Sequence, residues 1–82
     1  MATLVVAVTD ATTGAGIPYT MVQAGSLSDS TGLDGTASFD VPLNTTQVVK
    51  VRHNAYRPYT ASVSVNSDPT TVKVALQKVA LG

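Results

Sequence analysis

Short runs of apolar and β-branched residues, separated by Gly, Pro, Asn and Asp, follow one another along the whole chain. The clearest pattern lies near residue 60, where Tyr59, Ala61, Val63 and Val65 alternate with hydroxyl and amide side chains. This period of two residues predicts a strand with one dry face and one wet face. Comparable runs predict further strands over residues 3–9, 17–23, 26–28, 36–41, 48–53 and 71–77. No stretch has the period of an amphipathic helix.

The segments between the predicted strands are short and rich in turn-forming residues. Asp34-Gly35 is a strong hairpin signal, and residues 66–69 predict the last turn. Because no helix is available for a parallel crossover, we expect an all-β antiparallel sandwich of seven strands, or eight if the short strand pairs independently. Residues 1–82 are predicted to form a single domain that ends in an apolar tail, residues 78–82.

Composition indicates a domain with a small core and a weakly charged surface. The 82 residues include no cysteine, a single histidine and 12% charged residues, and the formal net charge is zero. A chain this short buries only about 60% of the surface that it exposes when unfolded. Disulfides are absent and repulsion between copies is weak, so oligomerisation or docking is the expected supplement. Phe39, the only phenylalanine, is expected to anchor the core.

Several motifs follow one another in a recognisable order: Asp10 at the end of the first predicted strand, Thr13-Gly14, Ile17-Pro18, residues 31–35 ahead of Phe39, and Ala55-Tyr56 before the alternating valines. This order resembles the carboxypeptidase regulatory-like, or transthyretin-like, β-sandwich superfamily. Two features depart from it: Ala55-Tyr56 stands where the superfamily has Gly-Tyr, and the turn before Phe39 is longer. The resemblance implies a transthyretin-like or Ig-like sandwich. It also implies a structural role, since members are mostly non-catalytic accessory, adhesion or scaffold modules.

Candidate catalytic and metal-binding groups are few. His53 could serve a hydrolytic triad, but the chain has no nucleophile elbow or other local signature, so we expect a surface or hydrogen-bonded histidine and no enzyme activity. Asp29 and Asp34 lie in one turn and are a weak candidate pair for calcium. Turn chemistry accounts for both carboxylates without a metal, and EF-hand spacing is absent. No cofactor is expected.

The chain has one cluster of basic and aromatic residues. Lys50 and Arg52 precede Tyr56, Arg57 and Tyr59, and the last three are the candidate ligand contacts. Such a cluster is typical of sites for an anionic glycan or for nucleic acid. The alternative is that both tyrosines close the end of the sandwich while the cations are solvated. Three cations on a neutral chain are a weak footprint for nucleic acid, so nucleic acid is not an expected partner.

Both ends of the chain carry more apolar residues than one sandwich needs. Residues 4–8 are apolar on both faces of the first predicted strand, and apolar residues continue beyond the last strand. We therefore predict an interface, formed by strand addition or tail docking, at Leu4, Val5, Ala7, Val79 and Leu81. The alternative is that the second face of the first strand lies under a loop of the same domain.

These patterns favour a non-catalytic structural protein. The leading hypothesis is a small decoration or accessory subunit of a virion or other surface polymer, acting as a homo-oligomer or within a larger protein assembly. The alternative is an adhesion or carbohydrate-binding β-sandwich module. The apolar run at residues 4–8 is too short for a signal peptide or a membrane span. We therefore expect an extracellular assembly made without its own signal peptide, with a cytoplasmic location as the alternative.

Overall fold

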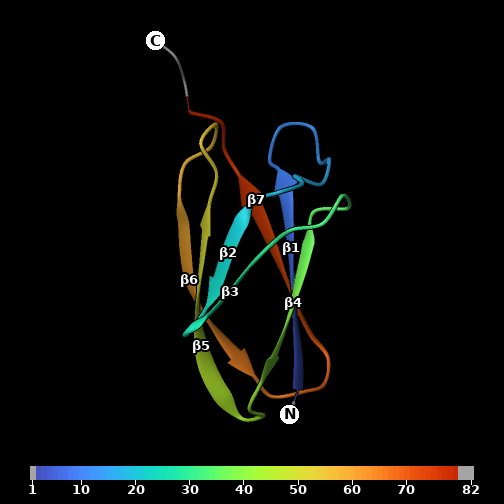
Figure 1. Ribbon diagram of the computed structural model, residues 1–82, viewed down its shortest axis with the longest axis vertical. Coiled ribbons are helices and arrows are strands. Elements are labelled where there is room, and N and C mark those ends of the chain that lie inside the picture. The colour runs from blue at the N-terminus through green and yellow to red at the C-terminus, as the bar shows by residue number, and fades with distance from the viewer. Residues whose placement is uncertain (1, 80–82) are drawn as a thin grey trace.

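Seven β-strands form in residues 2–79, the part of the chain that the computed structural model describes (Figure 1). They are β1 (Ala2–Asp10), β2 (Met21–Ala24), β3 (Leu27–Ser30), β4 (Thr36–Val41), β5 (Thr45–Arg52), β6 (Tyr59–Val65) and β7 (Thr70–Leu76). The strand expected at 17–23 begins only at Met21, because Pro18 has no N–H to pair and Tyr19 has a left-handed φ of 57°. None of the described residues belongs to a helix that is long and apolar enough to cross a membrane.

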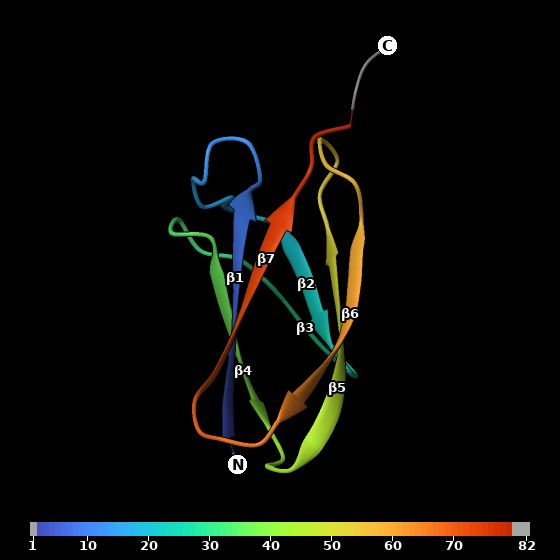
Figure 2. The same ribbon diagram turned by 180° about the vertical axis from the view of Figure 1, so that it is seen from behind.

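The strands form two sheets, which confirms the expected all-β sandwich (Figures 1 and 2). The three-stranded sheet has the order β4-β1-β7, and the four-stranded sheet has the order β3-β2-β5-β6. One pairing corrects the antiparallel expectation, since β1 and β7 run parallel, with Leu4 beside Thr70 and Asp10 beside Leu76. A parallel pair needs a long connection between its strands, and residues 11–69, which contain all the other strands, provide it.

The Asp34-Gly35 turn does not close the hairpin that the sequence predicts, because β3 and β4 belong to different sheets. At this turn the chain crosses from the four-stranded sheet to the three-stranded one. Gly35 has a φ of +83°, and a Cβ there would lie 2.6 Å from the carbonyl oxygen of Val8 and 2.8 Å from the Cα of Gly16. Only glycine fits where the turn passes so close to the end of β1.

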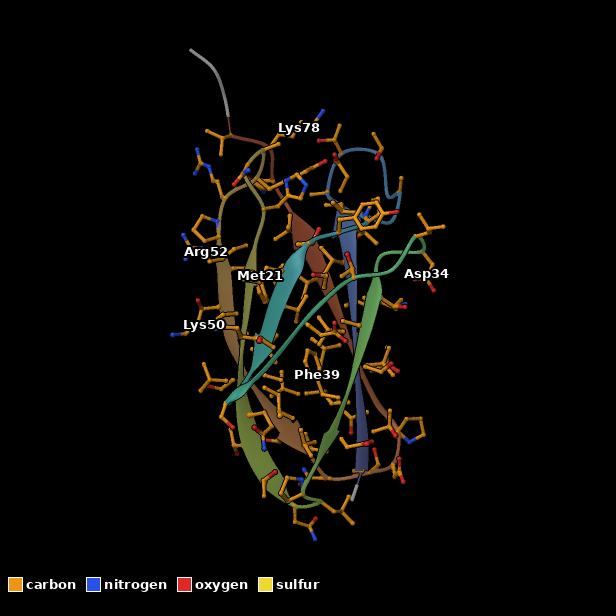
Figure 3. All side chains as sticks on the ribbon, viewed as in Figure 1. Met21, Asp34, Phe39, Lys50, Arg52 and Lys78 are labelled. Atoms are coloured by element: carbon orange, nitrogen blue, oxygen red, sulfur yellow. The ribbon has the colours of Figure 1, made fainter. Side chains whose placement is uncertain are left out.

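The core fills the space between the sheets with apolar side chains from alternate strand positions. β1 contributes Ala2, Leu4, Val6 and Val8, each at most 1% exposed. Phe39 is 5% exposed and lies between the two sheets (Figure 3), which confirms its expected place in the core. Half-buried side chains then extend this core toward the rim of the sandwich: Tyr56, Tyr59, Val63 and Val72.

Two buried threonines hold the segment before β2 against the end of β3. The backbone N–H of Thr20 donates to Oγ1 of Thr31 at 2.9 Å, and the Thr31 hydroxyl donates to the carbonyl of Ile17 at 2.7 Å. The Thr20 hydroxyl donates to the same carbonyl at 3.2 Å. Both hydroxyls therefore have partners inside the protein, as buried polar groups require.

Candidate functional site

A hydrogen-bonded carboxylate joins the two halves of the sandwich at one end. Asp10, the last residue of β1, accepts a hydrogen bond of 2.7 Å from the Tyr56 hydroxyl. It also accepts the backbone N–H groups of Thr12 and Thr13 at 2.7 and 3.2 Å. Tyr56 belongs to the loop between β5 and β6, so this contact fixes that loop against the opposite sheet.

The contact shifts the pKa of both partners. The hydrogen bond from Tyr56, together with the one from the backbone of Thr12, lowers the pKa of Asp10, because these donors stabilise the charged carboxylate. The same hydrogen bond to Asp10 raises the pKa of Tyr56, and burial adds to this rise. Near neutral pH, Asp10 therefore stays ionised and Tyr56 keeps its proton.

An open hollow of about 380 Å³ lies beside this contact, and we call it the end hollow. Its lining residues are Met21, Arg52, His53, Asn54, Tyr56 and Pro58. Met21 begins β2 and lies directly opposite Arg52, the last residue of β5, in the sheet register. Figure 3 shows both residues on the four-stranded sheet, with Lys50 further along β5. The other lining residues come from the loop between β5 and β6.

His53 is held in the end hollow by two contacts. Its Nδ1 accepts the backbone N–H of Ala55 at 3.1 Å, and its ring meets Tyr56 edge-on, with ring centroids 5.1 Å apart. A neutral imidazole that accepts at Nδ1 carries its proton on Nε2, so that nitrogen is a hydrogen-bond donor. Within residues 2–79, no hydrogen bond joins His53 to a serine hydroxyl or a carboxylate.

The structure separates the three candidate ligand contacts. Tyr56 lines the end hollow, whereas Arg57 and Tyr59 line a second hollow of about 240 Å³ beside the end of β7. Both Tyr56 and Tyr59 are half-buried and pack against the core, as the alternative interpretation expects. The exposed tyrosine is Tyr19, at 73%.

Sequence reasoning missed three lining residues of the end hollow, namely Met21, Asn54 and Pro58. The pairing of β2 with β5 brings Met21 next to Arg52, although 31 positions separate them in the chain, and no local pattern gives that register. Alternation along the chain provided no signal for Met21, because it shares one face of the strand expected at 17–23 with Ile17 and Tyr19.

The weak calcium candidates do not share one turn, which corrects the expectation, because Asp29 lies on β3 and Asp34 lies in the turn before β4. The Asp29 carboxylate accepts the backbone N–H of Ser30 at 2.8 Å. The Asp34 carboxylate accepts both the hydroxyl and the backbone N–H of Thr36, and these bonds lower the pKa of Asp34. The described part of the chain contains no group of three or more acidic or histidine side chains that could hold a metal ion.

The predicted interface residues fall into three environments. Leu4 is fully buried in the core of its own domain, so its assignment to an interface is wrong, because the strand alternation directs it between the sheets. Val5 and Ala7 are half-buried on the outer face of the three-stranded sheet. Val79 is 45% exposed, and its N–H donates to the Ala55 carbonyl at 3.1 Å, so the chain docks there on its own loop. Leu81 lies outside the described residues.

The four edge strands of the sandwich differ in charge. β3, β4 and β7 carry Asp29, Asp40 and Lys73, respectively, whereas β6 carries no charged residue and no proline. β6 lies at the outer side of the four-stranded sheet (Figures 1 and 2). Charges, prolines and bulges are the devices that prevent an edge strand from pairing with another chain. The β6 edge, residues Tyr59–Val65, is therefore the edge most open to strand addition.

Comparisons with known proteins inform the fold. The chain matches no protein-family model, and a search of curated proteins finds no match. Its structure is similar to that of a Bacteroides fragilis protein described as membrane-associated and of unknown function, with a TM-score of 0.72 and 23% sequence identity. The match covers 98% of this chain and 28% of the Bacteroides fragilis chain, so this chain spans little more than a quarter of that protein. At this identity the similarity shows the fold alone.

Proposed function

We propose that this chain is a non-catalytic structural protein that assembles with further copies of itself at the β6 edge. Its proposed setting is that of a small decoration or accessory subunit of a virion or other surface polymer, outside the cell. The observation that carries the proposal is an uncharged edge strand next to apolar residues that the domain only half covers: Ala61, Val63 and Val72.

Strand addition at the β6 edge suits a second copy of the same strand. In an antiparallel pair related by a two-fold axis at Ser62, Ala61 lies beside the partner's Val63, and Thr60 lies beside the partner's Ser64. Apolar side chains then meet apolar ones on the inner face, and hydroxyls meet hydroxyls on the outer face. The backbone groups left open at the edge gain partners, and the four-stranded sheet continues into the second copy.

Two further considerations support a structural module. The resemblance to carboxypeptidase regulatory-like, or transthyretin-like, sandwiches stays a prediction, and it favours a non-catalytic role. In the Bacteroides fragilis protein, the similar fold takes up 28% of a chain described as membrane-associated. The same fold thus occurs as one part of a longer protein, which is how an accessory module is used.

A lysine in the middle of the β6 edge tests the proposal. Ser62→Lys places a charge at the proposed two-fold axis, where it would face the partner's copy of itself, and Ser62 is exposed in the single chain. Ser38→Lys is the matched control, because Ser38 is also exposed and lies on β4, an edge of the other sheet. Sedimentation velocity over a range of concentrations, with circular dichroism to verify folding, reads out the assembly.

We expect wild type and Ser38→Lys to associate as concentration rises, and Ser62→Lys to remain monomeric while it keeps its fold. A wild type that stays monomeric at the highest concentration would overturn the proposal. Association of Ser62→Lys to the same extent as wild type would overturn the assignment of the interface to β6.

An adhesion or carbohydrate-binding module is the second proposed function, and the end hollow favours it. An aromatic ring, a guanidinium group and an amide converge there from β5 and the following loop. The two proposals concern different parts of the molecule, the end hollow and the β6 edge, so each can be tested without the other.

A further inference from the structure

The end hollow has the electrostatic character of an anion site. Arg52 supplies a permanently charged guanidinium with several N–H donors, and no acidic side chain is among the lining residues. The lining residue Tyr56 donates to the carboxylate of Asp10, and Asp10 accepts three hydrogen bonds within the fold. A carboxylate placed against Arg52 thus meets donors rather than a competing anion.

The other polar groups of the end hollow suit a ligand that carries hydroxyls. The Nε2 of His53 is left as a donor, because the backbone N–H of Ala55 occupies Nδ1. Asn54 offers a carbonyl oxygen and an amide nitrogen, so it can both accept from and donate to a hydroxyl. A sugar ring presents hydroxyls that need both kinds of partner, whereas a simple carboxylate needs donors alone.

The remaining wall of the end hollow is apolar and exposed. Met21 is 55% exposed on the outer face of β2, and Pro58 is exposed in the loop before β6. The C–H face of a sugar ring can cover such a surface and remove it from water. The volume of about 380 Å³ is at the lower end of the ~300–1,000 Å³ range of small-molecule sites, which suits one monosaccharide unit.

We propose that the end hollow binds an acidic sugar, a hexuronate unit, with its carboxylate on Arg52 and one ring face on Met21. Asn54 and His53 then contact ring hydroxyls, and Tyr56 is the rigid side wall because Asp10 holds its hydroxyl. This inference rests on the second proposed function and names the ligand class for it. It does not depend on assembly at the β6 edge.

The test uses the methyl group of Met21 as a probe inside the end hollow. The chain has two methionines, so a sample with carbon-13 in the methionine methyl groups gives a simple spectrum, which Met21→Leu assigns. Three probes are titrated: methyl glucuronide, methyl glucoside, which lacks the carboxylate, and N-acetylalanine, which is a carboxylate without the sugar ring. We expect the Met21 signal to saturate with the glucuronide, and the other two probes to bind at least about ten-fold more weakly.

Two variants on one strand face separate the site from general charge. Arg52→Gln should weaken glucuronide binding at least about ten-fold. Lys50→Gln removes the same charge two residues along β5, outside the lining of the end hollow, and should leave binding within about two-fold. Ser62→Lys should bind the glucuronide as wild type does, so this result is independent of the test of assembly.

Each of the following results would overturn the inference. The first is equal binding of the glucoside, which removes the role of the carboxylate. The second is equal binding of N-acetylalanine, which would show that the end hollow recognises a carboxylate without a sugar ring, such as the C-terminus of a peptide. The third is the absence of a saturable shift of Met21, or an equal loss in Lys50→Gln and Arg52→Gln, because either result denies a defined site around Arg52.

Discussion

Truncation of Leu4 tests which face of β1 forms the core. Leu4 is 0% exposed and lies between the sheets, so Leu4→Ala removes three carbon atoms from a filled space. At about 0.8 kcal/mol for each buried methylene, their transfer to water accounts for roughly 2.4 kcal/mol. The cavity left behind adds to this, so we expect the free energy of unfolding to fall by about 3–4 kcal/mol.

Val5→Ala is the matched control on the opposite face of the same strand. Val5 is only half-buried, and the truncation leaves no closed cavity, so the expected loss is about 1 kcal/mol or less. Leu4→Val, which removes one carbon atom, should cost about 1 kcal/mol and gives an intermediate point if Leu4→Ala unfolds completely.

Equilibrium urea unfolding followed by circular dichroism measures these differences, since the chain has no tryptophan to serve as a fluorescent probe. A domain of this size has a total stability of roughly 4–12 kcal/mol, so a loss of 3 kcal/mol is a large fraction of the whole. If Val5→Ala cost as much as Leu4→Ala, the assignment of the two faces of β1 would be refuted.

Two further predictions concern the turn glycines and the carboxylate contact. Gly14→Ala should lower the free energy of unfolding by about 1–2 kcal/mol, because of the positive φ alone. Gly35→Ala should cost clearly more in thermal unfolding, because a Cβ at Gly35 also meets the Val8 carbonyl, whereas a Cβ at Gly14 meets nothing within 4 Å. Equal losses in the two variants would contradict the close approach at Gly35. Folding lowers the pKa of Asp10, so the unfolded chain binds this proton more tightly, and the stabilisation present above about pH 4 is lost as the pH falls through the folded pKa. Tyr56→Phe removes the largest cause of that shift and should flatten the acid loss of stability in urea unfolding measured at several pH values; an unchanged acid profile would contradict the role of the hydroxyl.

Alternation along the chain was sufficient to predict most strands and the core, because a period of two residues directly reflects burial on one face. The strand at 36–41 and the anchoring of Phe39 follow from it. The pairing partners did not follow. The parallel pair of β1 and β7 joins segments at opposite ends of the chain, and the Asp34-Gly35 turn has the chemistry of a hairpin although it connects two sheets. Local patterns carry no information on which sheet a strand joins.

The same limit applies to the sites. The pattern of residues 4–8 correctly marks a strand that is apolar on both faces, but it does not say that Leu4 points into the core while Val5 points out. The cluster of tyrosines and arginines lies where the loop between β5 and β6 meets the end of the sandwich. Its division between two hollows, and the arrival of Met21 beside Arg52, depend on sheet register. Such sites become visible only when the strands are paired.

Amide hydrogen exchange, measured by NMR over a range of protein concentrations, tests most directly whether this domain assembles through β6. Pairing with a second copy protects the β6 amides that point away from β5, whereas the amides at the free edge of β3, the opposite edge of the same sheet, stay unprotected. Assembly through β6 predicts that protection at β6 increases with concentration while protection at β3 does not change. Exchange at β6 that is as fast in concentrated as in dilute solution would contradict it.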